Sequence, residues 1–421
     1  MTKFTRYQKL VIAMLAFLQF TVVLDFMILS PLGAFLLRDM GIATSQFGLV
    51  VSAYAFSAGI SGLLTAGFAD RFDRKRMLLF FYCGFVLGTL LCALAANFHF
   101  LLVARVVTGL FGGVISSISF AIITDLFPLQ VRGRVMGVVQ TAFAASQVMG
   151  LPLGLYLANH YSWHAPFFMI AGVAAVVGIG IAAFLRPIDE HLKIPGEANP
   201  LRHLVRTVGQ GRYLRGFAAT ILLATGGFML MPFGSAFTVH NLGIPLDRLP
   251  LIYMVTGVSS IVSGPIMGRL SDAIGKYSMF CVGSVVGMIV VGIYCNLGTT
   301  PIGWVIGINV VLFAAIMARM ISASALTSGI PDLKDRGAFM AVNSSLQQLS
   351  GGVASSVAGL VVVQSADGRL LHYPTLGIVV MCAMLITVGM MYPIHRMVKE
   401  RIAAETKAPT AGPSSPVRLT G

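Results

Sequence analysis

Long apolar stretches alternate with short polar connectors along almost the whole chain. Twelve of the stretches are long enough to cross about 30 Å of hydrocarbon as helices. Pro152, Pro232 and Pro265 fall inside them without disqualifying them, because neighbouring helices can satisfy the backbone groups that a proline frees. The predicted spans are residues 8–34, 46–69, 77–96, 100–124, 135–158, 165–185, 216–239, 249–270, 277–297, 302–327, 339–363 and 374–396.

The composition agrees with a chain that faces lipid. Hydrophobic residues make up 57% of the sequence and charged residues only 10%, whereas a soluble domain carries about 25% charged residues. We therefore predict an all-α membrane protein embedded in a lipid bilayer. The net charge of +14 lies in connectors rather than along one face, and no nucleic-acid-binding module is recognisable, so no nucleic acid partner is expected.

The basic residues predict the orientation of the spans. Of the 29 Lys and Arg residues, 24 fall in the termini and in connectors on the same side as the N-terminus. The opposite side carries Arg38, Arg248 and Arg369. Because Lys and Arg accumulate in cytoplasmic connectors, both termini are predicted to be cytoplasmic and the protein to lie in the inner membrane of the cell.

A charged turn occurs once in each half of the chain. Residues 66–76 contain Asp70, and residues 268–276 contain Asp272, which lies 202 positions later. The recurrence predicts two related bundles of six helices, each turning sharply after its second span. The predicted organisation is an N-terminal bundle, a linker with mixed charge, a C-terminal bundle and a disordered tail, over residues 1–186, 187–214, 215–402 and 403–421.

The spans, the central linker and the repeated turn resemble the major facilitator superfamily, and within it the twelve-helix drug/proton antiporters and sugar-efflux permeases. The family's turn has the pattern Gly-x-x-x-Asp-Arg/Lys-x-Gly-Arg-Lys. The second half matches it at Gly268, Asp272, Gly275 and Lys276. The first half matches at Asp70, Arg71, Arg74 and Lys75, with Ala66 and Asp73 in place of the two glycines.

Two further motifs carry the same resemblance. Leu101-x-x-x-Arg105-x-x-x-Gly109 resembles the family's arginine motif in the fourth span. The order Gly150-Leu-Pro152-Leu-Gly154 resembles the Gly/Pro signature of the antiporters, with the proline displaced by one residue. The resemblance implies the major facilitator fold of two pseudo-symmetric six-helix bundles and transport by alternating access. It also implies a gating role for the turns and for the Gly/Pro signature, although the turn cations also serve as topology signals.

Three ionisable side chains lie deep inside predicted spans: Asp25, Arg105 and Arg319. Each costs roughly 2.5–3.5 kcal/mol at the bilayer centre, so such residues usually face a partner or a water-filled cavity. Asp25 and Arg105 lie roughly 13 Å and 8 Å from the outer ends of their spans at about 1.5 Å per residue, and can face one cavity if the two helices are neighbours. The repeat places Gly227 and Asn309 at the corresponding positions of the second half, which therefore lacks this pair.

We interpret Asp25 as the proton carrier. Burial favours the neutral form of a carboxyl group and a nearby arginine favours the ionised form, so the two influences can leave the group able to gain and lose a proton. The alternative is a static Asp25–Arg105 ion pair that holds two helices together. Arg319 is interpreted either as a contact for an anionic group or as a residue that snorkels or pairs with Asp332 or Asp335.

Uncharged polar residues inside the spans are candidates for lining a substrate cavity, although interhelical hydrogen bonds would explain any one of them. They are Gln19, Tyr54, Gln140, Gln147, Asn343, Gln347 and Gln348. No metal site is predicted, since His160 and His164 have no acidic or cysteine neighbour to complete one. No phosphate-binding loop of the ATPase type is present, so no cofactor is expected beyond a proton as the coupling ion.

The expected function is secondary active transport, not enzymatic catalysis: export of a small organic molecule, such as a drug or a sugar, in exchange for protons. We expect a monomer whose partners are its small-molecule substrate and the bilayer. Two alternatives stay open at this stage: proton-coupled or passive uptake of a metabolite, and a membrane receptor that transports nothing.

Overall fold

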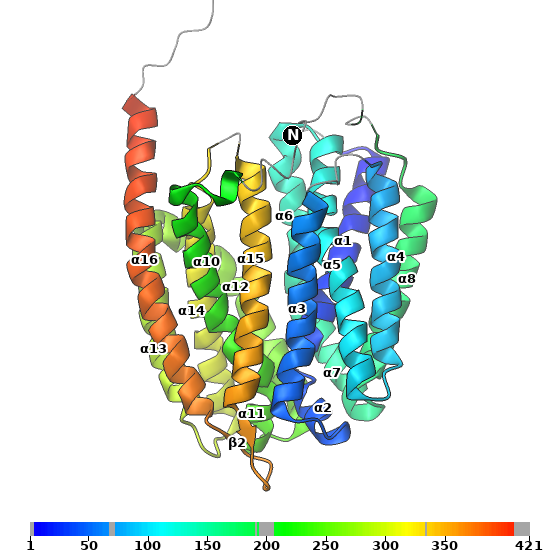
Figure 1. Cartoon of the computed structure of the whole chain (residues 1–421), viewed down its shortest axis with the longest axis vertical. Coiled ribbons are helices and arrows are strands. Elements are labelled where there is room, and N and C mark those ends of the chain that lie inside the picture. The colour runs from blue at the N-terminus through cyan, green and yellow to red at the C-terminus, as the bar shows by residue number, and fades with distance from the viewer. Residues whose placement is uncertain (1–3, 67–71, 190–191, 193–205, 333–334, 408–421) are drawn as a thin grey trace, which may run out of the picture.

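The computed structural model describes residues 4–66, 72–189, 192, 206–332 and 335–407. Long, nearly parallel helices form two halves that stand side by side (Figure 1). The N-terminal half contains α1 (Arg6–Ile28), α2 (Gly33–Asp39), α3 (Thr44–Ala66), α4 (Arg74–Ala93), α5 (Phe98–Leu126), α6 (Leu129–Ala145), the π-helical η2 (Ser146–Gly150), α7 (Leu151–His160) and α8 (Ala165–Phe184).

The C-terminal half repeats this order of long helices and adds a small hairpin. It contains α10 (Gly211–Leu230), η4 (Met231–Phe233), α11 (Gly234–His240), η5 (Leu246–Arg248), α12 (Leu249–Ile274), α13 (Lys276–Cys295), α14 (Ile302–Thr327), α15 (Arg336–Val361), β1 (Val363–Gln364), β2 (Leu370–Leu371) and α16 (Tyr373–Lys407). The two strands pair antiparallel. The start of α1 and the end of α16 lie at the same face of the bundle, here called the terminal face, and α2, α11 and β2 lie at the opposite, far face (Figure 1).

Eleven of the described helical segments are both long and apolar enough to cross a membrane. The prediction of twelve apolar spans is one too high, and the exception is α15. This helix has 26 residues and runs alongside α3 (Figure 1), but Asn343, Gln347, Gln348 and several serines lower its hydropathy. Such a polar helix suits a position inside the bundle better than one against lipid.

The chain's own polar residues fix several helix ends. Thr5 Oγ1 accepts a hydrogen bond from the Gln8 backbone N–H at 3.2 Å, and Asn97 Oδ1 accepts one from the Phe100 N–H at 2.9 Å. Asp73 Oδ1 does the same for Arg76 at the start of α4, at 2.7 Å. These bonds satisfy N–H groups that have no partner within their own helix. Gly275, with φ +97°, allows the abrupt turn from α12 into α13.

The predicted domain boundaries fall between long helices. α8 ends at Phe184 and α10 begins at Gly211, so the last four residues of the predicted linker are helical. Most of that linker, residues 190–191 and 193–205, lies outside the described residues. α16 continues through Lys407, five residues into the segment predicted to be a disordered tail, and residues 408–421 lie outside the described part.

The apolar core is shared between the halves at the far face and divided at the terminal face. One buried cluster combines residues of both halves, among them Phe35, Phe47, Phe233 and Phe237. At the terminal face there are two clusters, one within the N-terminal half and one within the C-terminal half; Leu63 of α3 reaches the second. The halves are therefore sealed together by apolar packing mainly at the far face.

Hydrogen bonds between the halves strengthen the same closure. Ser235 Oγ donates to the Ser30 carbonyl at 2.9 Å, and Ser30 Oγ donates to the Met231 carbonyl. Thr44 Oγ1 donates to the Val362 carbonyl at 2.5 Å. Each links a turn or helix end of one half to the other half at the far face.

The helices α3 and α15 form the closest seam between the halves. A Cβ atom placed on Gly48 would lie 2.7 Å from the Ser355 carbonyl oxygen, and one on Gly359 would lie 2.9 Å from the Thr44 carbonyl oxygen. Ser52 Oγ donates to the Gly352 carbonyl at 2.7 Å and receives a hydrogen bond from Ser356 Oγ at 2.8 Å. Small residues thus allow the two backbones to touch, as is common where membrane helices pack.

Candidate functional site

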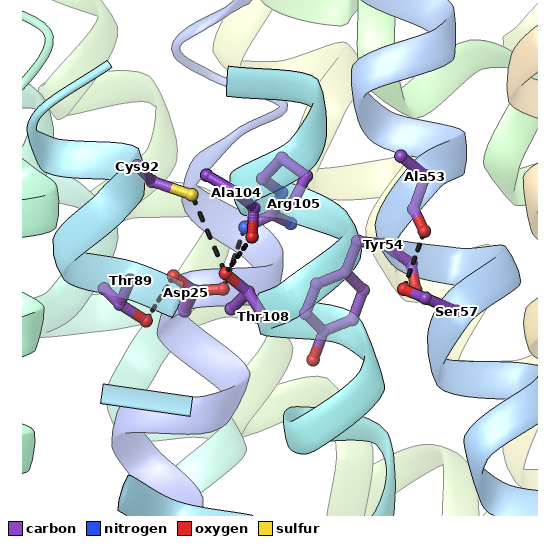
Figure 2. Close-up of polar contacts among 9 residues, drawn as sticks. All are labelled: Asp25, Ala53, Tyr54, Ser57, Thr89, Cys92, Ala104, Arg105 and Thr108. Atoms are coloured by element: carbon purple, nitrogen blue, oxygen red, sulfur yellow. Dashed lines mark hydrogen bonds and ion pairs between the residues drawn. The ribbon is translucent and has the colours of Figure 1, made fainter. Parts of the chain in front are cut away.

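A fully buried ion pair joins α1 and α5 in the N-terminal half. Arg105 Nη1 donates to Asp25 Oδ2 at 2.9 Å, and Thr89 Oγ1 of α4 donates to Asp25 Oδ1 at 3.2 Å (Figure 2). Asp25 is 0% exposed and Arg105 is 1% exposed. Three helices therefore supply a carboxylate, a guanidinium and a hydroxyl that satisfy one another away from water, as charges in such surroundings require.

The other side of Arg105 rests on an aromatic ring. Its guanidinium carbon lies 4.6 Å from the centre of the Tyr54 ring on α3 (Figure 2), close enough for a cation–π interaction. Arg105 Nε is fully enclosed and has no hydrogen-bond partner among the described residues. A cation with an enclosed, unpaired Nε–H is thus held between a carboxylate and a ring.

Gly109 allows this arrangement by bringing α5 against α3. A Cβ atom at this position would lie 2.0 Å from Ser57 Oγ and 2.5 Å from the Tyr54 carbonyl oxygen. Only glycine permits so close an approach. The spacing Arg105-x-x-x-Gly109 therefore has a packing reason: one helical turn separates the cation from the contact that places it beside Tyr54.

The ion pair lies next to the sealed far face. Asp25 is three residues from the end of α1, and Arg105 is seven residues from the start of α5. Leu24, Cys92, Leu101 and Ala104, which flank the pair in sequence or space, all belong to the apolar cluster that both halves share. The predicted depth of Asp25 was measured from residue 34. Because α1 ends at Ile28 and the chain turns into α2, Asp25 is closer to its helix end than predicted, yet it is fully buried.

The Gly/Pro signature follows a break in helical geometry. Residues Ser146–Gly150 form a π-helical turn between α6 and α7, with half-buried Pro152 directly after it. Gly150 faces Leu24 and Gly154 faces Ile28 on α1, where added Cβ atoms would approach within 2.6 Å and 2.7 Å. π-Turns occur frequently at functional sites. Gln147 lies in this turn, and its enclosed Oε1 has no partner among the described residues.

Arg319 is buried in the C-terminal half, and its contacts differ from those of Arg105. Its Nε donates to Ser284 Oγ on α13 at 3.1 Å, and its guanidinium lies 5.6 Å from the centre of the Phe280 ring. The two acidic residues considered as partners are engaged elsewhere. Asp332 pairs with Arg212, and Asp335 accepts a hydrogen bond from the Tyr213 hydroxyl at 2.9 Å.

The remaining candidates for cavity lining do not converge on one point. Gln19 Oε1 accepts a hydrogen bond from Ser116 at 3.1 Å, and Asn343 Oδ1 accepts one from Thr220 at 2.7 Å. Gln140 is exposed. Gln347 and Gln348 are half-buried on α15. For Gln19 and Asn343 the structure shows the interhelical hydrogen bonds that the sequence left open as an alternative.

The charged turn of the N-terminal half is partly described. Arg74 is buried and its Nε donates to Asp125 on α5 at 3.1 Å. Asp73, which replaces a glycine of the motif, accepts from the Ile188 N–H at 2.8 Å in addition to its cap. Asp70 and Arg71 lie outside the described residues. These contacts therefore connect the start of α4 to α5 and to the segment that follows α8.

The corresponding turn of the C-terminal half is more open. Gly268 and Asp272 lie near the end of α12, and Gly275 separates α12 from α13. Asp272 is exposed, and no neighbouring atom lies within 4 Å of a Cβ placed on Gly268. Asp125, Thr89 and Cys92 were not singled out from the sequence. The signal that could have found Asp125 and Thr89 is their polarity near or inside spans.

Comparisons with known proteins agree with this architecture. The family model described as the Major Facilitator Superfamily matches residues 15–355. The chain belongs to the major facilitator superfamily. It is 25% identical over 345 residues to the "Uncharacterized MFS-type transporter YceJ" of Bacillus subtilis (strain 168), covering 81% of this chain and 86% of that one.

A second relative and a solved structure widen the comparison. A "Probable sugar efflux transporter" of Helicobacter pylori (strain G27) is 24% identical over 233 residues, which cover 55% of this chain and 58% of that protein. The structure of a bacterial homologue of the human lysosomal transporter Spinster, in an inward-facing and unoccupied conformation, aligns with a TM-score of 0.68 at 16% identity. It covers 96% of this chain and 98% of that one, which shows a shared fold. The protein is thus a multi-pass membrane transporter and not an enzyme.

Proposed function

We propose that this transporter is a proton-coupled exporter of small organic molecules and that Asp25 carries the proton. The observation that carries the proposal is the enclosed pair of Asp25 and Arg105, 2.9 Å apart in a bundle with few other buried charges. The comparison with a probable sugar efflux transporter supports export, and the Gly/Pro signature beside α1 supports the antiporter branch.

The position of the pair suggests how protons and substrate could alternate. In the present conformation the far face is sealed above Asp25, and the carboxylate is fully satisfied by Arg105 and Thr89. Opening of the far face would bring water to Asp25. Protonation would then remove the charge that holds Arg105, and the freed guanidinium could rearrange as the halves rock.

The orientation belongs to the same proposal. With the terminal face in the cytoplasm, as the basic residues predict, the far face points out of the cell and the present conformation is closed to the outside. A proton from outside would then reach Asp25 when the substrate is released outside. One proton entering for each departing substrate molecule is the simplest exchange that one carboxyl group can support.

The test uses purified full-length protein in liposomes that contain the pH-sensitive dye pyranine. Arabinose, glucose, gluconate and ethidium are added in turn, and proton movement that depends on each compound is recorded. Wild-type protein should exchange protons for at least one compound, and Asp25→Asn should abolish that exchange because its amide cannot release a proton at working pH. Asp367→Asn is the matched control, since Asp367 lies exposed in the hairpin at the far face.

The outcome also separates the alternatives. Export by exchange requires that substrate leaves the compartment into which protons flow, so flux of labelled substrate in the same direction as protons would favour uptake. Wild-type vesicles in which no compound moves would favour a receptor. Proton exchange in Asp25→Asn vesicles at the wild-type rate would remove Asp25 from the mechanism.

A further inference from the structure

Arg319 is buried without a neutralising acid. It lies on α14, eight residues before the end of that helix at Thr327, and is 5% exposed. At about 1.5 Å per residue, this places it roughly 12 Å inside the terminal face. Its immediate surroundings are the Phe280 ring, the Ser284 hydroxyl and Gly283 on α13.

The outer nitrogens of its guanidinium are unused. Only Nε makes a hydrogen bond, to Ser284, within the part of the chain that the structure describes. Nη1 and Nη2 are not among the fully enclosed polar atoms that lack a partner. They therefore keep a small accessible surface, although the residue as a whole is 5% exposed. The Ser284 hydroxyl accepts the hydrogen bond from Nε and donates in turn to the Phe280 carbonyl at 2.8 Å. This second bond fixes the position of the Ser284 oxygen.

The described acidic residues do not compensate this charge. Asp332 and Asp335 are engaged with Arg212 and Tyr213, and Asp272 on the neighbouring α12 is exposed at the terminal face. The other deep charges, Asp25 and Arg105, cancel each other. The described interior of the spans therefore carries one uncompensated positive charge, which attracts anions and repels cations.

We propose that Arg319 binds the anionic group of the transported molecule, so that the substrate is an organic carboxylate or phosphate rather than a lipophilic cation or a neutral sugar. This rests on the proposed transport function. A guanidinium with two free nitrogens side by side matches the two oxygens of a carboxylate or phosphate. The bond from Nε to Ser284 restrains the plane of the guanidinium and leaves both outer nitrogens for one ligand.

The test is ligand-induced thermal stabilisation of purified full-length protein at fixed pH and ionic strength. The probes are gluconate, glucose 6-phosphate, citrate and benzoate, with neutral glucose as the uncharged counterpart. At least one anion should stabilise the wild type more than glucose does. Arg319→Gln should weaken that binding about tenfold or more, the order expected when a charge-assisted pair of hydrogen bonds is lost.

Two other variants make this result specific. Arg396→Gln removes a cation that is exposed on the same half and near the same face, and it should bind the anion like the wild type. Arg319→Lys keeps the charge but loses the planar fork, and should bind with intermediate affinity; it also serves if Arg319→Gln does not fold. Without ligand, Arg319→Gln should unfold at the wild-type temperature or above, because it removes an uncompensated buried charge.

Three outcomes would overturn the assignment: no stabilisation by any of the anions, equal binding to wild type and Arg319→Gln, or an effect of phosphatidylglycerol in nanodiscs with none from the soluble anions. The last would assign the guanidinium to a lipid headgroup. Asp25→Asn is measured in parallel and should keep anion binding while losing proton exchange. Failure of the anion site thus differs from failure of the proton site.

Discussion

The two halves of the bundle place their buried arginines in opposite circumstances. Arg105 lies near the far face, 2.9 Å from a carboxylate that Thr89 also holds. Arg319 lies toward the terminal face, with a serine hydroxyl and a phenyl ring but no acid among the described residues. The same side chain thus completes a neutral cluster in one half and leaves an excess of charge in the other.

This difference shows that the internal repeat does not determine which polar residues lie inside each half. The halves share their order of long helices and their charged turn, yet the repeat puts Gly227 and Asn309 where the ion pair would be. Packing constrains the scaffold in both halves, whereas each half carries its own polar chemistry. A pseudo-symmetric transporter can therefore separate the proton from the substrate by assigning them to different halves.

Replacing each arginine by leucine should produce the largest difference in stability between the two halves. Arg105→Leu leaves Asp25 buried and unpaired, which should destabilise the protein by about 3–5 kcal/mol. Arg319→Leu should be neutral or stabilising without ligand. Thermal and denaturant unfolding in one detergent would measure both. Equal destabilisation by the two variants would show that Arg319 has a compensating partner after all.

Gly109→Ala should have the next largest effect. The added methyl group would lie 2.5 Å from the Tyr54 backbone oxygen, so α3 and α5 must move apart, at a cost of about 1–3 kcal/mol. Gly283→Ala is its counterpart beside Arg319, where the nearest atom is 2.9 Å away, and should cost less. Gly137→Ala, with no neighbour within 4 Å, is the control and should not lower the unfolding temperature.

The smallest effect should come from the hydroxyl groups beside the two arginines. Thr89→Val removes the 3.2 Å bond to Asp25 and should cost about 1 kcal/mol in unfolding free energy while slowing proton exchange. Ser284→Ala removes the 3.1 Å bond to Arg319 and should instead weaken anion binding. If each variant affected both measurements equally, the two halves would not divide the tasks.

Sequence alone predicted the spans and brought Asp25 and Arg105 to similar depth, because both inferences need only hydropathy and helix rise. It could not predict that Thr89 joins the pair, since a threonine in a span more often bonds within its own helix. It also overcounted the apolar spans. α15 matches the family order but owes its place to contact with α3 rather than to its own hydropathy.

The network around Arg74 shows the same limit. The cations of residues 71–76 predict gating or topology roles, and nothing in the pattern connects Arg74 with Asp125, which lies 51 residues away. Asp73 departs from the family motif, which has glycine at this position. Its side chain caps α4 and accepts a hydrogen bond from the Ile188 N–H. Predicting this role requires knowing where α4 begins and where the chain runs after α8.

The π-helical turn at Ser146–Gly150 divides one membrane crossing into two mechanical parts. Below the turn, Val135 and Val139 of α6 are packed into the apolar cluster of the N-terminal half alone. Above it, Leu151 and Leu155 of α7 are packed into the cluster that both halves share. A displacement of α7 can therefore be absorbed within the five residues of the turn, and α6 can keep its neighbours while α7 and the shared cluster at the far face shift.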